Sequence, residues 1–96
     1  MKIKISYSAY KDIDAAQLFY ESQKAGLGIY FQDSIFSDID SLHIYAGVHL
    51  TQYGKYRLLS KKFPYAIYYY INVGEIVISA VLDCRRNPDL IKNKLR

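Results

Sequence analysis

The chain has 96 residues, a formal net charge of +4 and 51% hydrophobic residues. This length predicts one domain spanning residues 1–96, and Cys84 is the only cysteine, so an internal disulfide is excluded. The start of the chain lacks the apolar core of a signal peptide, and no apolar run approaches the roughly 18 residues of a membrane span. We therefore expect a cytoplasmic protein with no membrane partner.

The N-terminal half predicts one strand and two helices. Apolar residues alternate over 2–7, which is typical of a strand with one buried face. They recur at helical spacing over 10–24 and again over 29–46. Asp12 and Asp14 lie near the expected start of the first helix, where the helix dipole favours negative charge. The glycine-containing connection at 25–28 is short, so we expect the two helices to form an antiparallel hairpin.

The C-terminal half predicts a meander of strands. A loop is expected over 47–54, followed by strands over 55–63, 65–72 and 75–83. Pro64 separates the first two strands because it cannot donate a ladder hydrogen bond. The order β-α-α-β-β-β predicts an α+β fold, in which the antiparallel helix hairpin covers one face of a four-stranded, mostly antiparallel sheet.

The sheet face away from the helices is a candidate binding surface. The expected strand 75–83 is apolar on both sides, so this face requires cover from the basic tail, 85–96, or from a partner. Within the tail, Pro88 marks the start of a short helix. Residues 1–50 carry four Lys and six Asp or Glu, whereas residues 51–96 carry nine Lys or Arg and three Asp or Glu. The second half is therefore either an anion-binding surface or a solvated, solubilising one.

Four short segments, in this order and at this spacing, have a counterpart in a known family. They are GIYF at 28–31, YR at 56–57, FPYAIYY at 63–69 and AVLDCRRNP at 80–88. Through them the chain resembles toxins of the RelE/ParE superfamily of type II toxin–antitoxin systems over nearly its whole length. The resemblance implies a growth-inhibiting toxin that is silenced by a cognate acidic antitoxin.

The resemblance leaves two mechanisms open, because the superfamily contains ribosome-dependent messenger-RNA endonucleases and inhibitors of DNA gyrase. RNA cleavage needs cations for the developing charge and groups that move protons. Arg57 and either Arg85 or Arg86 match cations of the RelE-like ribonucleases. Leu59 and Ala66, however, stand where those enzymes have Lys and Arg, and the tail lacks Tyr and His. The chain is therefore closer to ParE, with gyrase as the implied target.

Two alternatives remain beside the gyrase inhibitor. One is a ribosome-dependent endonuclease, with Arg57, Arg85 and Arg86 as its catalytic residues. The other is a non-toxic module that binds the antitoxin. Whether the protein is an enzyme thus stays open at this point.

Seven residues are candidates for contacts with a partner or an anion: Arg57, Lys61, Tyr68, Tyr70, Asp83, Arg85 and Arg86. Several of them also have a structural interpretation. Arg57 either contacts an anion or pairs with Asp83 or Glu75 across the sheet. Tyr68 and Tyr70 share a strand face, where they either stack on bases or belong to the core or the antitoxin contact. Lys61 precedes a turn, where a lysine is commonly just solvated.

The remaining reactive side chains predict no catalytic or metal site. His43 and His49 are interpreted as surface or capping residues, and Cys84 as a small buried residue rather than an activated thiolate. The histidines and acids form no spaced ligand pattern, and no glycine-rich phosphate loop is present. We therefore expect no metal and no small-molecule cofactor.

Overall fold

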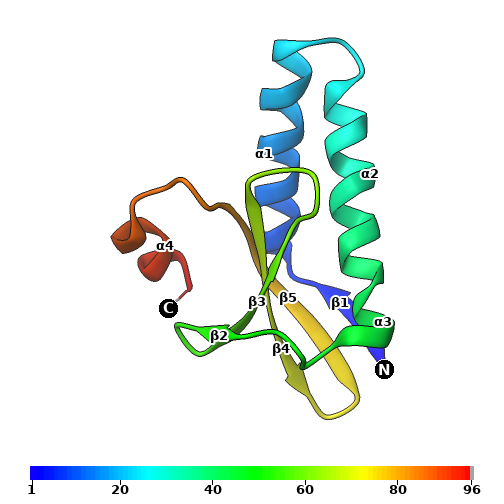
Figure 1. The fold of residues 1–96 in the computed structure, drawn as a ribbon, viewed down its shortest axis with the longest axis vertical. Helices are drawn as coiled ribbons and strands as arrows, with labels where there is room; N and C mark the ends of the chain where they lie inside the picture. The colour runs from blue at the N-terminus through cyan, green and yellow to red at the C-terminus, as the bar shows by residue number, and fades with distance from the viewer. Residues whose placement is uncertain (96) are drawn as a thin grey trace.

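The computed structural model describes residues 1–95 (Figure 1). The elements are β1 (Lys2–Ile5), α1 (Tyr7–Gln23), α2 (Leu27–Asp40), α3 (Leu42–Tyr45), β2 (Thr51–Gln52), β3 (Lys55–Leu59), β4 (Tyr65–Asn72), β5 (Glu75–Asp83) and α4 (Pro88–Leu95). The sheet order is β1-β5-β4-β3-β2, with β1 parallel to β5 and the other pairs antiparallel. The antiparallel hairpin of α1 and α2 lies on one side of the sheet and α4 on another. None of the helices described in residues 1–95 is long and apolar enough to span a membrane.

The sheet has five strands, so the prediction of four was one short. The extra strand, β2, lies within the segment expected to be a loop, and it pairs with Lys55 and Tyr56 of β3. Tyr53 and Gly54 connect β2 to β3 with φ angles of 54° and 79°. Positive φ at both turn positions matches the twist of a two-residue hairpin, and this geometry makes the short strand possible. β3 ends at Leu59, four residues before the predicted end.

The predicted helices have different boundaries in the structure. The first begins at Tyr7 rather than at residue 10, because Ser6 is its N-cap and its hydroxyl accepts a hydrogen bond from the Ala9 N–H at 3.1 Å. The predicted second helix is interrupted at Ser41, so it forms α2 and the separate turn α3. The expected hairpin itself is confirmed.

A close approach holds the two helices of the hairpin together near their connection. A Cβ atom at Gly28 would lie 2.7 Å from the carbonyl oxygen of Gln17, so only glycine fits there. The Glu21 carboxylate accepts hydrogen bonds from the N–H groups of Gly26 and Gly28, at 3.0 and 2.9 Å. It thereby satisfies donors at the N-terminus of α2, where the helix dipole favours negative charge.

The hairpin buries the larger of two apolar clusters against the sheet. Aromatic rings dominate one end, where Tyr20, Phe31, Phe63 and Tyr65 have ring centroids 4.9 to 6.2 Å apart. The fully buried members include Ala9, Ile13, Phe31, Ile35, Leu42, Ile67, Tyr69, Ile76 and Ile78. This cluster forms the main core of the protein.

A β-bulge in β5 changes which of its residues face the hairpin. Tyr68 pairs with Ala80 and Tyr69 pairs with Ile78, so Ser79 is the extra residue. Regular alternation along the strand would place Ile76, Ile78, Ala80 and Leu82 on one face. Ile76 and Ile78 do face the hairpin, but Ala80 and Leu82 belong to the cluster on the opposite face. The bulge splits the strand between the two faces.

The face opposite the hairpin is covered in part by the chain's own tail. Ile91 and Leu95 of α4 are buried against strand residues of that face, and the whole cluster comprises Ala66, Tyr68, Ala80, Leu82, Ile91 and Leu95, with Cys84 partly buried beside it. Of the two kinds of cover expected from the sequence, the structure therefore contains the tail.

Candidate functional site

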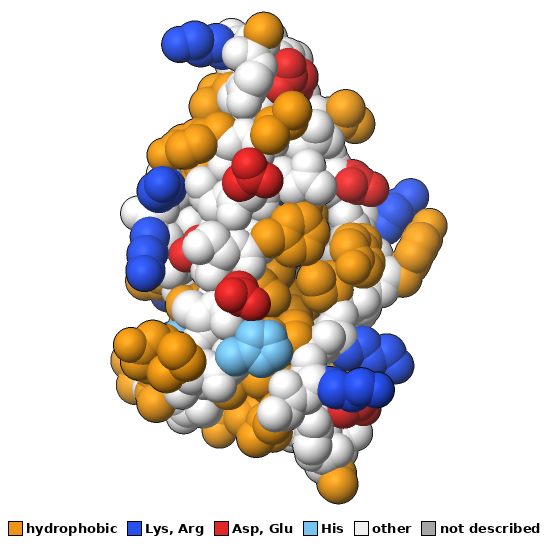
Figure 2. Space-filling model, turned by 90° about the vertical axis from the view of Figure 1, so that its right-hand side faces the viewer, with side chains coloured by type: hydrophobic (Ala, Val, Ile, Leu, Met, Phe, Trp, Pro, Cys, Tyr) orange, Lys and Arg blue, Asp and Glu red, His pale blue; other side chains and the backbone are white. Residues whose placement is uncertain are grey.

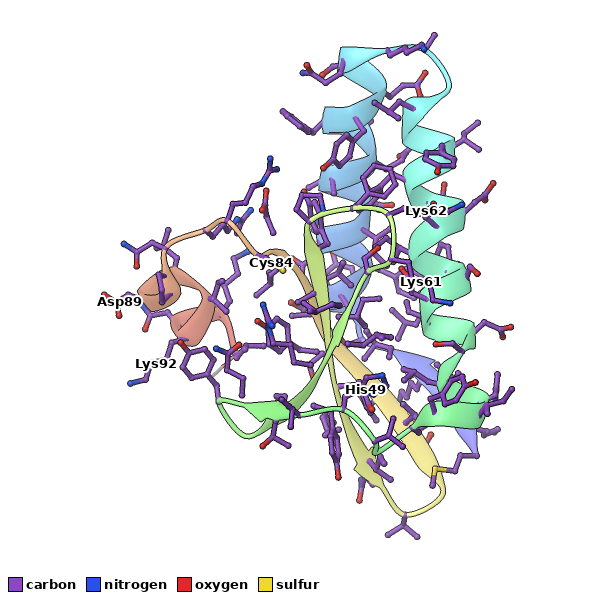
Figure 3. All side chains as sticks on the ribbon, in the orientation of Figure 1. His49, Lys61, Lys62, Cys84, Asp89 and Lys92 are labelled. Atoms are coloured by element: carbon purple, nitrogen blue, oxygen red, sulfur yellow. The ribbon has the colours of Figure 1, made fainter. Side chains whose placement is uncertain are left out.

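The seven candidate residues lie in three separate places. Arg57, Tyr68 and Tyr70 lie on the α4 face of the sheet, where Arg57 and Tyr68 are direct cross-strand neighbours. Asp83, Arg85 and Arg86 lie at the end of β5 and in the connection to α4. Lys61 lies in the turn between β3 and β4, beside α2 (Figure 3). The structure thus provides no single surface on which all of these side chains meet.

Arg57 is held by neutral side chains on the α4 face. Its Nε donates a hydrogen bond to the Tyr68 hydroxyl at 3.2 Å, and its Nη2 lies 3.5 Å from Sγ of Cys84. The Tyr68 hydroxyl in turn donates to Oε1 of Gln52 at 3.3 Å. Within residues 1–95 Arg57 forms no ion pair, so of the two alternatives for this residue the pairing with Asp83 or Glu75 is not present. The guanidinium keeps its charge available although its orientation is fixed.

The two tyrosines of β4 share a face, as predicted, but differ in their exposure. Tyr68 is 1% exposed, so its ring belongs to the core beneath α4 and is not available for stacking on a base. Tyr70 is 37% exposed, and the Lys55 ammonium lies 4.6 Å from the centre of its ring. This cation–π contact occupies one face of the exposed ring.

Arg85 is turned toward the hairpin side of the sheet, away from Arg57. Its guanidinium makes a two-pronged contact with the Asp83 carboxylate, with N–O distances of 2.9 and 2.7 Å. This contact lowers the pKa of Asp83 and raises that of Arg85. Burial raises the pKa of Tyr65 to about 12, an effect that Arg86 and Arg85 oppose from nearby. Arg57 and Arg85 therefore lie on opposite faces of the sheet and contact different residues.

A cleft of about 520 Å³ opens between α1, the end of β5 and α4. Its lining comprises four cations, two acids and an apolar floor: Lys11, Arg85, Arg86, Lys94, Asp12, Asp83, Ala15, Ala16, Phe19, Tyr65 and Val81. We call it the cationic cleft. The Phe19 side chain is 52% exposed at its wall. A cation-lined cleft with apolar surface can bind an acidic, partly apolar segment.

Asp12 joins the three elements that form the cationic cleft. Its Oδ2 accepts a hydrogen bond from the Val81 N–H at 3.0 Å, and its Oδ1 lies 3.8 Å from the Lys94 ammonium. Burial raises the pKa of Asp12, and the hydrogen bond and the two nearby cations, Lys94 and Arg86, oppose this shift. The sequence suggested a helix-dipole role for Asp12. Its tertiary role was missed, because no local pattern marks a contact to a strand 69 residues away.

A second groove, of about 510 Å³, lies on the outer strands and contains Arg57 together with His49. Leu50 and Leu59, also in its lining, are 86% and 53% exposed. His49 (labelled in Figure 3) is not a free surface residue, because its Nδ1 contacts the Tyr69 hydroxyl. Burial lowers the pKa of His49, which keeps its ring neutral near pH 7.

The Tyr69 hydroxyl links His49 to the loop that precedes β2. It accepts a hydrogen bond from the Gly47 N–H at 2.9 Å and also contacts Nδ1 of His49. One ring nitrogen of His49 is therefore engaged within the fold, which favours a structural role for this side chain.

Cys84 and the acidic side chains were considered as a reactive thiol and as metal ligands. Cys84 is partly buried at the start of the connection from β5 to α4 (Figure 3). Within residues 1–95 no three His, Cys, Asp or Glu side chains are grouped so that they could hold a metal ion.

The arrangement of a helix hairpin on one face of a β1-β5-β4-β3-β2 sheet is an α+β fold. Among solved structures, a chain of a "Chromosomal ParDE TA system from P. aeruginosa" superposes on this chain with a TM-score of 0.73 and 20% sequence identity. The similarity covers 84% of this chain and 92% of that chain. No protein-family model and no curated protein matches the sequence. The α+β fold predicted from the order of the elements is thus confirmed, apart from the number of strands.

Proposed function

We propose that this chain is the toxin of a bacterial type II toxin–antitoxin pair, and that it arrests growth by binding DNA gyrase in the cytoplasm. The observation that carries the proposal is the structural similarity to a chain of a ParDE system, which extends over 92% of that chain. The similarity covers most of both chains, so it includes the whole domain and not only a shared core. The proposal also takes up the closeness to ParE that the residue comparison indicates.

The antitoxin is the partner that we assign to the cationic cleft. The cleft has four cations against two acids, and Asp83 and Asp12 already contact Arg85 and Lys94. Arg86 and Lys11 are therefore the cations left for carboxylates of a partner. An acidic segment that is disordered when free gains both contact area and charge complementarity there.

The cationic cleft gives a direct test of this assignment. The variant Arg86→Glu should weaken antitoxin binding at least about tenfold, because it turns an attraction at the interface into a repulsion. Lys24→Glu is the matched control, since it makes the same charge change on an exposed residue at the tip of the hairpin. Titration calorimetry with the purified antitoxin measures both variants. Equal losses would show that only net charge matters and would reject the cleft.

The gyrase target is tested separately from the antitoxin. Induction of the chain alone should stop growth, induce the DNA-damage response and, with purified gyrase, accumulate cleaved DNA. Coexpression of the antitoxin should reverse all three effects. Growth arrest without cleaved DNA and without inhibition of supercoiling would reject gyrase as the target.

A ribosome-dependent endonuclease is the second candidate, and the groove that holds both Arg57 and His49 is the observation in its favour. Three features weigh against it. Arg57 and Arg85 lie on opposite faces, Tyr68 is buried, and Nδ1 of His49 is engaged by the Tyr69 hydroxyl. Mapping of transcript ends during arrest decides the matter, because new ends that vanish in Arg57→Ala would support cleavage. Intact transcripts would dispose of it.

A non-toxic module that binds the antitoxin is the third reading of the same fold. It predicts harmless expression in the absence of antitoxin, together with tight antitoxin binding. Growth arrest when the chain is induced alone excludes this interpretation.

A further inference from the structure

Within residues 1–95, one carboxylate oxygen is buried without a hydrogen-bond partner. Asp38 of α2 is 5% exposed, and its Oδ2 has no hydrogen-bond partner in the part of the chain that the structure describes. No ion pair in residues 1–95 involves Asp38 either. A buried polar atom with no partner lowers the stability of the folded state, and a buried charge lowers it further. Asp38 therefore requires an explanation outside the packing of the core.

The pocket beside Asp38 is small and lined by polar groups. Its volume is about 170 Å³, and its lining comprises Tyr30, Asp33, Ser34, Ser37, Asp38, Lys61 and Lys62. This volume is below the roughly 300 to 1,000 Å³ of pockets for drug-sized ligands. It suits a single inserted side chain. We call it the Asp38 pocket.

The two lysines at the pocket do not neutralise Asp38. Figure 3 shows Lys61 and Lys62 on the turn between β3 and β4, beside α2. Neither comes within ion-pair distance of an acid among the described residues. The Lys62 ammonium instead lies 5.1 Å from the centre of the Tyr30 ring. The turn thus borders the pocket without filling it.

The surroundings of the pocket favour a cationic occupant. α2 carries Asp33, Asp38 and Asp40 and no Lys or Arg. Figure 2 views the molecule from the side on which α2 lies in Figure 1, and it shows acidic side chains along the middle of that face, with basic ones mainly at its margins. An approaching cation therefore meets an acidic surface before it reaches the buried carboxylate.

The lining also narrows the kind of cation. Two carboxylates with two serine hydroxyls and two neighbouring lysines are a poor oxygen cage for a divalent ion. The Ser34 hydroxyl donates to the Tyr30 carbonyl oxygen at 2.7 Å, so its lone pairs remain free to accept. A planar guanidinium matches a carboxylate with hydroxyl acceptors beside it, and it can lie against an aromatic ring such as Tyr30.

From these observations we infer that the Asp38 pocket is a receptor for one arginine side chain of a protein partner. The Asp38 carboxylate accepts the guanidinium, Ser34 and Ser37 offer further acceptors, and Tyr30 provides the wall. This interface lies on the acidic α2 face, apart from the cationic cleft. It goes beyond the proposed toxin function and does not depend on it.

The inference is tested by titrating the ¹⁵N-labelled chain with N-acetyl-arginine-N-methylamide and following the amide signals by NMR. We expect shifts centred on residues 30–38 and 61–62. The Asp38→Asn variant should bind at least about tenfold more weakly, because a hydrogen bond to a charged group contributes roughly that factor or more. Asp40→Asn, which changes an exposed carboxylate of the same helix, should bind like the parent. Equal binding by the parent and Asp38→Asn would overturn the inference.

Two further probes define the ligand chemistry. The neutral isostere N-acetyl-citrulline-N-methylamide should produce no shifts in the pocket, and putrescine should bind more weakly than the arginine derivative. Stronger binding of putrescine would assign the pocket to a small amine and overturn the protein partner. Binding of the citrulline compound as strong as that of the arginine compound would overturn the role of charge.

A stability measurement separates this inference from an internal ion pair. Asp38→Asn should raise Tm in the absence of ligand, since it removes a buried charge that lacks a partner. A Lys61→Met change should act independently of it, so the effects of the two substitutions should add. A lower Tm for Asp38→Asn that depends on Lys61 would show that the chain itself supplies the cation. That result would overturn the inference while leaving the proposed toxin function intact.

Discussion

The two faces of the sheet are closed by different means. The hairpin face is sealed by large side chains from two long helices, among them Phe31 and Ile35, both with 0% exposure. On the other face, the short helix α4 contributes Ile91 and Leu95. The hairpin face holds the fold together, whereas the α4 face is thinly covered. Arg57, a candidate for contact with an anion, lies on the thinly covered face.

The difference has a thermodynamic consequence. The free energy needed to open a region locally depends on the apolar area that covers it, so it varies across one molecule. The hairpin cannot leave the sheet without exposing the main core. α4 can leave with the loss of a few apolar contacts, so we expect amide exchange to be fastest in α4 and slowest in β4.

Removal of a ring from the hairpin face should give the largest effect. Phe31→Ala should lower the free energy of unfolding by about 3 to 5 kcal/mol, because it creates a cavity among the three aromatic rings of Tyr20, Phe63 and Tyr65. Urea denaturation followed by circular dichroism measures the loss. Leu18→Ala, at a residue with 67% exposure on α1, should stay within about 0.5 kcal/mol of the parent. Similar values for the two variants would contradict the sealed core described for this face.

The corresponding substitution on the α4 face should have a smaller effect. Ile91→Ala should lower the free energy of unfolding by about 2 kcal/mol, at the lower end for a buried isoleucine because α4 covers the face alone. The neighbouring Leu90 is 57% exposed, and Leu90→Ala should change stability by no more than about 0.5 kcal/mol. If Ile91→Ala were as damaging as Phe31→Ala, the two faces would not differ in the way described.

Two adjacent tyrosines allow the same comparison at the level of single hydroxyl groups. Tyr69→Phe leaves the Gly47 N–H without its partner and removes the contact with His49, so it should lower stability by about 1 to 2 kcal/mol. Tyr68→Phe should lower it by less than about 1 kcal/mol, because Arg57 is only half-buried and Gln52 is exposed, so both can bind water instead. Denaturation of both variants in one buffer tests the order. The reverse order would contradict it.

The sequence predicted the elements well where a local pattern carries the information. The hairpin connection at Gly26 and Gly28, and strands β4 and β5, follow from glycine positions and apolar runs. β2 was missed because its two residues, Thr51 and Gln52, have no periodicity to detect. The bulge at Ser79 was missed because an extra residue in a strand depends on its partner's register.

The candidate site was predictable in residue type but not in arrangement. The sequence predicted a group of basic residues in the second half of the chain, either anion-binding or solvated. The structure divides these residues between two faces through the contacts of Arg57 with Tyr68, 11 residues apart, and of Arg85 with Asp83, 2 residues apart. The long-range contact of Asp12 and the isolation of Asp38 follow only from packing, so the sequence gives no sign of either.

The cationic cleft, which lies between the hairpin and α4, should show the smallest effect. This effect is a dependence of stability on pH. Arg85 lowers the pKa of Asp83 below its ordinary 3.8, so the folded state favours the ionised carboxylate. The resulting stabilisation is present above about pH 4 and is lost as the pH falls through the lowered pKa. The difference in unfolding free energy between the parent and Asp83→Asn should therefore shrink toward zero below pH 3.8.

Asp12, in the same cleft, should respond with the opposite sign. Its pKa is raised by burial, so the folded state takes up a proton more readily than the unfolded one. The stabilisation from this uptake is present below pH 3.8 and is lost as the pH rises through the raised pKa. Asp12→Asn should therefore gain stability relative to the parent over that rise, while the exposed control Asp14→Asn stays level. If the stability of Asp12→Asn and that of Asp83→Asn, each relative to the parent, changed with pH in the same direction, α1 and α4 would not enclose Asp12 in the cationic cleft.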